Sequence, residues 1–257
     1  MEDFFGFGGY KRTPEGYMSW QHLTFVFSMI AAMIVLAIVL GIKNKNKPQK
    51  EKNVPIIVAA IAIDAFEIFK IVVMCLKDGS LSPVLRALPL FLCSIQLIAL
   101  PVAAFSKGRA KEFALDFVFI FGLLGAILGT VGAGQNYSCY PVLSIDNVVS
   151  AITHCISGFG CLYIGISGMR SMKQSNIKAE MIIFVVFCAV AYVADVLIPY
   201  NYMFLIRGDG TPYDIFYNIV GGSPVLYPVS VVGTLIVYML LFFFIDKKIS
   251  ARKTKKQ

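Results

Sequence analysis

Seven stretches of this chain are apolar over about 20 residues each, and this pattern limits its possible folds more than any other feature. About 20 residues of α-helix cross the hydrocarbon core of a bilayer. Helices are required because backbone groups in lipid must find partners within the same segment. We therefore expect an all-α, polytopic transmembrane bundle. The predicted spans are residues 21–42, 54–76, 84–105, 113–134, 147–168, 179–200 and 225–246.

The composition agrees with a protein that is surrounded by lipid. Apolar residues make up 58% of the chain and charged residues 15%, whereas a soluble domain carries about 25% charged residues. The first 20 residues lack the basic region and the small-residue cleavage site of a secretory signal peptide. The sequence contains no glycine-rich phosphate loop and no soluble catalytic domain. We expect one transmembrane domain over residues 1–257, whose chemistry uses residues of the spans and short loops.

The net charge of +8 indicates membrane topology rather than nucleic-acid binding. Lysine and arginine concentrate in the connections after the first, third and fifth runs and in the C-terminal tail, which together hold 17 of these residues. The remaining connections and the N-terminal segment hold five. Because cytoplasmic loops carry the excess of basic residues, we place the tail in the cytoplasm. An odd number of spans then places the N-terminus outside.

Cysteine and histidine usage gives no sign of a metal site. The six cysteines form no CxxC pair and no zinc-ligand spacing, and five of them lie within predicted spans. The chain contains only two histidines, which excludes a histidine-rich metal site. We predict no metal and no cofactor.

Charged side chains within predicted spans are costly in lipid and therefore suggest a function. Asp64, Glu67 and Lys70 follow one another at intervals of three in the second span, so they share one broad helix face. A purely structural ion pair between Glu67 and Lys70 explains them equally well. Asp195 lies about six residues from the outer end of the sixth predicted span and is harder to explain structurally.

Cys93 and His154 are predicted to lie at similar depths in the membrane. A lone buried cysteine is most often a small hydrophobic residue, and a lone buried histidine is most often a hydrogen-bonded core residue. Cys93 lies nine residues from the outer end of its span and His154 seven, which gives depths of roughly 13 and 10 Å. Glu67, Asp195 and His22 also fall in the outer half of the membrane.

A thiol beside a histidine is a nucleophile–base arrangement. Cys93 would attack a carbonyl after His154 takes its proton, and in a membrane the natural carbonyl is the ester of an acyl chain. A carboxylate or a second histidine could orient His154; the candidates are Glu67, Asp195 and His22. An amide or hydroxyl could donate to the oxyanion or hold the head group; the candidates are Gln96, Asn201 and Tyr202.

Three segments resemble the YwaF-type family of bacterial integral membrane proteins. They are LPLFLCSI at 88–95, THCISGFGCLYI at 153–164 with FGLLGAILG before it, and NYMFL at 201–205 followed by a Gly-Gly-x-Pro turn at 221–224. His22 falls where the family tends to place a histidine, and the resemblance covers nearly the whole chain.

This family is similar to transmembrane protein 164, a lipid acyltransferase. The resemblance implies a catalytic cysteine followed by a histidine two spans later, which would be Cys93 and His154, and a membrane phospholipid as acyl donor or acceptor. It also implies a multi-pass location in a bacterial plasma membrane. The chain departs from the family at Phe91, where relatives often carry Gln or His, and at Asp146 and Asn147, where some carry a further histidine.

Two other functions remain open from the sequence. A small-molecule or proton-coupled transporter would use the same intramembrane residues as a relay, and the prolines at 89, 101 and 228 would break its helices. The sequence shows no internal repeat, which counts against a transporter. In a structural or sensory protein, the same polar residues would hold helices together through hydrogen bonds of about 0.6–2 kcal/mol each.

Overall fold

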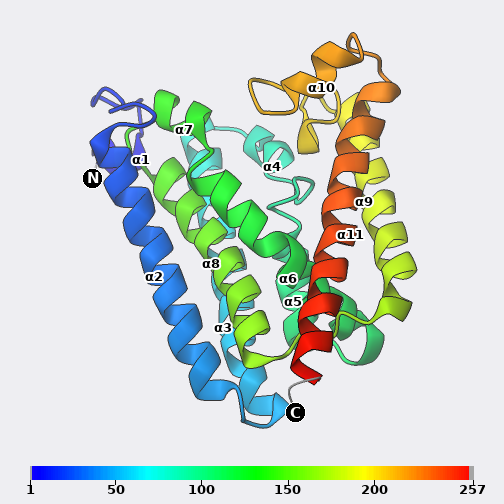
Figure 1. Ribbon diagram of the computed structural model, residues 1–257. Coiled ribbons are helices and arrows are strands. Elements are labelled where there is room, and N and C mark those ends of the chain that lie inside the picture. Colours follow the sequence, from blue (N-terminus) through cyan, green and yellow to red (C-terminus); the bar gives the residue numbers. More distant parts are fainter. Residues whose placement is uncertain (1, 255–257) are drawn as a thin grey trace. The chain divides into compact units, whose positions relative to one another are not determined.

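The computed structural model describes residues 2–254, which are helical with short connections and contain no strand (Figure 1). The chain divides into two compact units, one ending at Ser171 and the other beginning at Met172. Five helical stretches of the described chain are long and apolar enough to cross a membrane. They are Trp20–Asn44, Gly108–Cys139, Ile145–Ser167, Gln174–Leu197 and Leu226–Ile249. The predicted class, an all-α protein with several apolar helices, is confirmed.

The first unit contains eight helices. They are α1 (Glu2–Phe5), α2 (Trp20–Asn44), α3 (Gln49–Asp78), α4 (Ser82–Arg86), α5 (Gln96–Phe105), α6 (Gly108–Thr130), α7 (Gly134–Cys139) and α8 (Ile145–Ser167). Serine side chains cap the starts of α2 and α8: Ser19 accepts from the His22 N–H at 3.2 Å, and Ser144 accepts from the Asn147 N–H at 3.3 Å. Gly79 and Gly168 end α3 and α8 in the left-handed conformation, with φ of 62° and 74°.

Helix α8 lies at the centre of this unit and packs against α2, α3 and α6 (Figure 1). Glycines on α8 make this possible, because each lies directly against a neighbouring helix. A methyl group on Gly158 would lie 2.4 Å from the Met33 sulfur of α2 and 2.7 Å from Ala126 of α6. The core therefore depends on close helix contacts between small residues, as is usual where lipid offers no hydrophobic driving force.

Residues 84–105 do not form the continuous helix that we predicted. They are divided between α4 and α5, and residues 87–95 between these helices form turns. Pro89 provides no backbone N–H and disfavours helix at the residue before it. Ser94 then closes a turn, because its hydroxyl accepts from the Phe91 N–H at 2.9 Å and donates to the Phe91 carbonyl at 3.1 Å. Helix α5 has 10 residues and spans about 15 Å, half of the hydrocarbon core.

The N-terminal segment is fixed against the adjacent ends of α3 and α8. Phe4 and Phe5 pack against Val73 of α3 and against Ile145 and Val149 of α8. The Tyr10 hydroxyl donates to the Asp146 carboxylate. Lys77 lies 3.2 Å from the same carboxylate and 4.7 Å from the centroid of the Tyr10 ring. One buried carboxylate thus joins three segments that are far apart in the sequence.

The second unit contains two long helices and the segment between them. Its elements are η1 (Gln174–Asn176), α9 (Ile177–Leu197), η2 (Tyr202–Phe204), α10 (Asp214–Ile219) and α11 (Leu226–Thr254). The two long helices pack against one another, and the Tyr192 hydroxyl of α9 donates to the Pro224 carbonyl just before α11 at 3.1 Å. Both long helices begin within a few residues of the predicted starts of the last two spans.

The contact between Tyr10 and Asp146 predicts a pH dependence of stability. Burial and the Asp146 carboxylate raise the pKa of the Tyr10 hydroxyl above its usual range. Folding therefore favours the neutral phenol. Its contribution to stability is complete below the unfolded-state pKa of about 10, and it declines above that pH because the unfolded chain loses the proton first.

We expect the melting temperature of the protein in detergent micelles to fall more steeply above about pH 10 for the wild type than for Tyr10→Phe. Tyr17→Phe is the matched control, because Tyr17 is an exposed tyrosine of the same segment, and it should retain the steeper fall. A Tyr10→Phe protein with the wild-type pH profile would contradict this assignment.

Candidate functional site

A stripe of glycines on α6 forms one wall of the candidate site. Gly122, Gly125 and Gly129 lie on one face of this helix, within the segment FGLLGAILG. A methyl group on Gly122 would lie 2.7 Å from the Ser157 carbonyl oxygen of α8. The Ser157 hydroxyl donates to the Gly122 carbonyl at 3.2 Å, and the Cys161 thiol donates to the Phe119 carbonyl at 3.0 Å. Without side chains on this face, α6 and α8 approach closely enough for hydrogen bonds to form between them.

Cys93 packs against this stripe from the broken third segment. A methyl group on Gly125 would lie 3.4 Å from the Cys93 Cβ, which is ordinary van der Waals contact. The backbone N–H groups of Cys93 and Ser94 lie close to the Cys93 sulfur. Cys93 is half-buried. The thiol thus lies in a non-helical turn three residues before the start of α5.

His154 packs against the next glycine of the same stripe. A methyl group on Gly129 would lie 2.0 Å from both Cδ2 and Nε2 of the His154 ring, so the imidazole occupies the space that a side chain would fill. Positions four apart on a helix have Cβ atoms about 5–6 Å from each other. Cys93 therefore lies against Gly125 and His154 against Gly129, and these two glycines are one helical turn apart on the same face of α6.

The hydrogen bond at Nδ1 defines which nitrogen of His154 can act as a base. Nδ1 lies 2.7 Å from the Ser150 carbonyl oxygen, an atom that only accepts, so Nδ1 carries the proton of the neutral ring. The Ser150 hydroxyl lies 3.3 Å from the same nitrogen. Nε2, which lies against α6, is then the unprotonated nitrogen. A backbone carbonyl, which the sequence analysis did not anticipate, therefore orients this histidine.

The charged residues of α3 face the interior of the first unit near this pair. Lys70 and Glu67 form an ion pair with an N–O distance of 2.8 Å, and their side chains are 18% and 13% exposed. Both charges lie within electrostatic range of Cys93 and of His154. The Glu67 carboxylate is engaged by Lys70, and its role in orienting His154 stays a prediction. The intrahelical pair proposed as the structural alternative is present.

Gln96 is a buried amide without a partner. Its side chain is fully buried, and neither Nε2 nor Oε1 has a hydrogen-bond partner among the described residues. The Gln96 N–H donates to the Cys93 carbonyl at 3.3 Å, which closes a turn and places the two side chains on the same side of the chain. Leaving a buried amide unpaired costs about 1–3 kcal/mol, so it needs an explanation.

His22 is fixed near the C-terminal end of α6. The ring is fully buried, its Nδ1 accepts from the Met18 N–H at 3.2 Å, and its centroid lies 4.1 Å from that of Tyr137. It also lies beside the backbone of Thr130, the residue after Gly129. His22 and His154 therefore both lie near the C-terminal end of α6, and the role of His22 as an orienting group stays a prediction.

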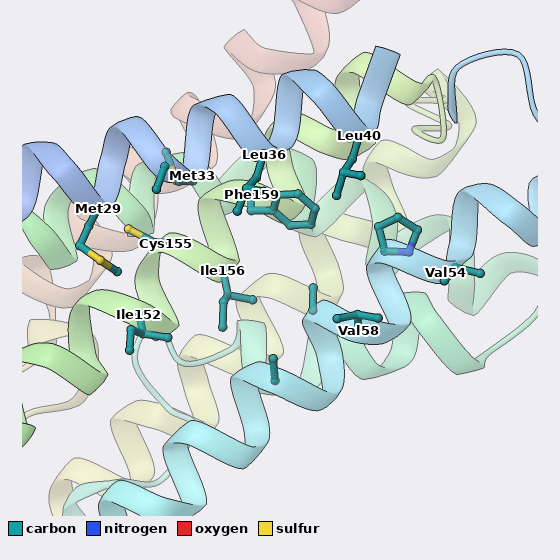
Figure 2. Close-up of a pocket in the computed structure, with 14 residues that line it drawn as sticks. Met29, Met33, Leu36, Leu40, Val54, Val58, Ile152, Cys155, Ile156 and Phe159 are labelled. Carbon is teal, nitrogen blue, oxygen red and sulfur yellow. The ribbon is translucent and has the colours of Figure 1, made fainter. Parts of the chain in front are cut away.

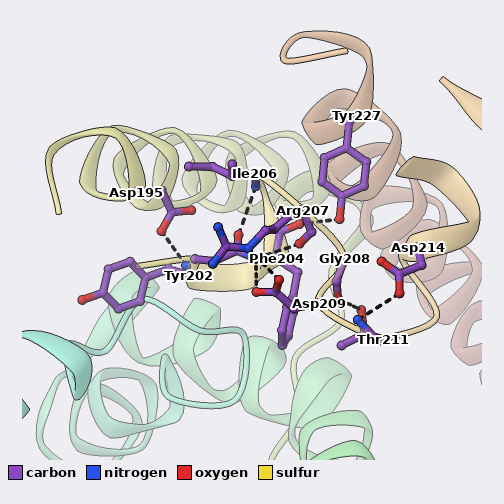
Figure 3. A network of polar contacts seen from close by, with 12 residues as sticks. Asp195, Tyr202, Phe204, Ile206, Arg207, Gly208, Asp209, Thr211, Asp214 and Tyr227 are labelled. Atoms are coloured by element: carbon purple, nitrogen blue, oxygen red, sulfur yellow. Dashed lines mark hydrogen bonds and ion pairs between the residues drawn. The ribbon is translucent and has the colours of Figure 1, made fainter. Parts of the chain in front are cut away.

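Asp195, Asn201 and Tyr202 lie in the second unit and form a network of their own (Figure 3). The Asp195 Oδ1 accepts from the Tyr202 N–H at 2.5 Å. The Asn201 amide donates to the Arg207 carbonyl at 2.7 Å and to Asp209 at 2.8 Å, and accepts from the Ile206 N–H at 3.1 Å. Both amide hydrogens of Asn201 are thus used within the loop.

The same loop contains strained backbone. Met203 and Phe204 have φ values of 54° and 56°, which side chains other than glycine rarely adopt. The Tyr227 hydroxyl of α11 donates to the Phe204 carbonyl at 2.8 Å, which helps to hold this conformation. The NYMFL motif therefore encodes a tight turn that uses the whole Asn201 amide, whereas the Gln96 amide has no partner among the described residues.

Alanine substitutions at Gly125 and Gly129 of the glycine stripe should have different effects on stability. Alanine at Gly129 would collide with the His154 ring, whereas alanine at Gly125 would make ordinary contact with Cys93. We expect Gly129→Ala to destabilise the protein by about 1–3 kcal/mol through overpacking. Gly125→Ala should be neutral or stabilising by up to about 1 kcal/mol, because alanine favours helix. Unfolding of both variants in mild detergent measures the difference, and equal stabilities would contradict the placement of His154.

The comparisons with known proteins agree with this description. No curated protein and no solved structure is significantly similar to the chain. The model of the TMEM164 family matches residues 17–245, a range that contains the glycine stripe, the broken segment and the NYMFL turn. This chain belongs to the TMEM164 family of membrane proteins.

Proposed function

We propose that this protein is a membrane-embedded enzyme that transfers acyl chains of membrane lipids, or hydrolyses their esters, with Cys93 and His154 as its catalytic pair. The observation that carries the proposal is their placement on neighbouring glycines of α6, with the basic nitrogen of His154 lying against this face. A nucleophile and a base must lie close together for proton transfer between them.

The first half of the reaction forms an acyl-enzyme. His154 Nε2 takes the thiol proton, and the Cys93 sulfur attacks the ester carbonyl of a lipid to give a tetrahedral oxyanion. When this species collapses, the bond to the alcohol oxygen breaks, and His154 returns its proton to that oxygen. The products are a lysolipid and a thioester on Cys93.

The second half of the reaction regenerates the thiol. His154 takes the proton of an acceptor hydroxyl, whose oxygen attacks the thioester carbonyl and displaces the sulfur. The sulfur then regains its proton from His154. A lipid hydroxyl as the acceptor gives acyl transfer, and water gives hydrolysis, so access of water to the site decides between the two outcomes.

Three hydrogen-bond donors near Cys93 could stabilise the oxyanion that forms in each half of the reaction. The backbone N–H groups of Cys93 and Ser94 lie beside the sulfur, and the unpaired Gln96 amide lies one turn further along the chain. Donors arranged in advance around a developing negative charge contribute strongly to catalysis in a site that excludes water. An oxyanion would also give the buried Gln96 side chain the partner that it lacks.

We further propose that the chain crosses a cell membrane seven times, with its N-terminus outside and its C-terminus in the cytoplasm. Helix α3 is 30 residues long, and its charges at Glu67 and Lys70 neutralise one another within the span. Residues 82–105 would form the third, broken span. Non-helical backbone is tolerated at membrane depth where it lies within the protein or lines a cavity, as an active site at Cys93 requires.

The broken third segment also supports one alternative, a small-molecule or proton-coupled transporter. Transporters often place their binding sites at discontinuous helices, and Asp64, Glu67 and Lys70 lie on the neighbouring α3. Proteoliposomes distinguish the two functions. Solute or proton movement that survives Cys93→Ser would favour transport over acyl transfer.

The catalytic pair is tested with the purified protein in vesicles that contain a phospholipid with one labelled acyl chain. We expect Cys93→Ser and His154→Gln each to lower acyl release or transfer by about 10²–10⁴-fold. The wild-type protein should show an acyl mass adduct on the peptide that contains Cys93. Cys75→Ser is the matched control, because Cys75 is a half-buried cysteine of α3 outside the site. Full activity in Cys93→Ser would contradict the proposal.

Replacement of Gln96 by an apolar residue should raise the stability of the protein and lower its activity. Gln96→Leu removes an unpaired buried amide and keeps a similar volume, so we expect stability to rise by about 1–3 kcal/mol. The same change should lower the rate of acyl transfer by roughly 10²–10³-fold, as for the loss of an oxyanion donor. Thermal unfolding and the labelled-lipid assay measure the two effects, and a variant that is both less stable and fully active would contradict this role.

A further inference from the structure

An apolar groove of about 430 Å³ lies between α2, α3 and α8 of the first unit (Figure 2). None of its 14 lining side chains is charged. Its walls include Met29 and Leu40 of α2 and Val58 of α3, and α8 contributes Ile152 and Phe159. The volume is within the range of small-molecule sites, about 300–1,000 Å³.

The groove has the length of one acyl chain. It follows α2 from Met29 to Leu40, a rise of about 16 Å. The hydrocarbon core of a bilayer is about 30 Å thick, so the groove covers about one leaflet. If the groove were empty, its lining atoms would lack van der Waals contacts on one side. An acyl chain that fills it supplies these contacts.

One end of the groove meets a cluster of lysines. Leu40 and Val54 line this end, and α2 ends four residues after Leu40, at Asn44. Residues 43–52 comprise the end of α2, the connection to α3 and the start of α3, and they carry five lysines, Lys43, Lys45, Lys47, Lys50 and Lys52, and one acidic residue, Glu51. Glu51 is paired with Lys47 at 3.3 Å. Lys43, Lys45 and Lys50 are exposed, and no carboxylate among the described residues pairs with them.

We propose that this groove binds one acyl chain of an anionic phospholipid, whose headgroup is held by the lysines of residues 43–52, where α2 joins α3. The apolar slot and the basic cluster are independent features of the chain, and together they match the two ends of such a lipid. Basic clusters next to the cytoplasmic ends of transmembrane helices attract anionic headgroups with about 1 kcal/mol per lysine.

This lipid is distinct from the substrate of the proposed reaction. His154 lies against α6, whereas Ile152, Ile156 and Phe159 line the groove on a different face of α8. The site therefore goes beyond the proposed function and does not rest on it. Binding is measured without any turnover, so an inactive protein can still test the site.

The groove is tested by filling it. The protein is reconstituted in vesicles of equal parts phosphatidylglycerol and phosphatidylcholine with identical acyl chains, extracted in mild detergent, and its retained lipids are counted by native mass spectrometry. Ala32→Phe fills the groove, and Ala31→Phe enlarges the neighbouring exposed alanine of α2, which does not line it. We expect Ala32→Phe to lose the retained phosphatidylglycerol and Ala31→Phe to keep it.

The lysines are tested by charge removal. Lys43→Gln combined with Lys45→Gln should lower the preference for phosphatidylglycerol over phosphatidylcholine by roughly 30-fold, from about fivefold per lysine. Lys107→Gln combined with Arg109→Gln removes the same charge from exposed positions elsewhere and should leave the preference unchanged. Equal retention of both lipids by the wild type, or equal retention of phosphatidylglycerol by Ala31→Phe and Ala32→Phe, would overturn the proposal.

Discussion

The close contact between α6 and α8 is the interaction on which the rest of the first unit depends. It exists because α6 presents glycine at positions 122, 125 and 129, so that the Ser157 carbonyl, the Cys93 Cβ and the His154 ring lie against bare backbone. A single methyl group at Gly129 would occupy the position of the imidazole. The glycines of α6, which carry no side chain, therefore determine where the Cys93 and His154 side chains can lie.

The sequence predicted the helices well and the break poorly, for one physical reason. Hydropathy reports how favourably a segment transfers from water into lipid, and residues 84–105 are as apolar as a continuous span. The turn at 87–95 instead depends on local backbone chemistry at Pro89 and Ser94. Residue type and predicted depth suggested Cys93 and His154 as a pair, but they could not indicate the contact of His154 with the Ser150 carbonyl, because every residue has a backbone carbonyl. In the second unit, residue type alone could not show that the Asn201 amide is used within its own loop.

Some buried polar groups of the described residues have partners within the chain and others do not, and the proposed mechanism gives one of the unpartnered groups a role. The Glu67–Lys70 pair and the Asn201 amide are satisfied within the chain, so stability alone explains them. The Gln96 side chain is as deeply buried but has no partner among the described residues. In the proposed mechanism the oxyanion would be the missing partner, which would give the Gln96 amide a reason other than folding to remain unpaired.

Helix α8 connects the two sites of the first unit, because its opposite faces serve different partners. One face holds His154 against Gly129, and the other forms the floor of the apolar groove with Ile156 and Phe159. Close-packed helices transmit displacement, since they contain little free volume. Under the two proposals, a chain that fills the groove would support α8 from the side away from α6 and so help to keep the imidazole in contact with the glycine stripe. The bound lipid would then influence catalysis through the position of one helix, without contact with the reacting atoms.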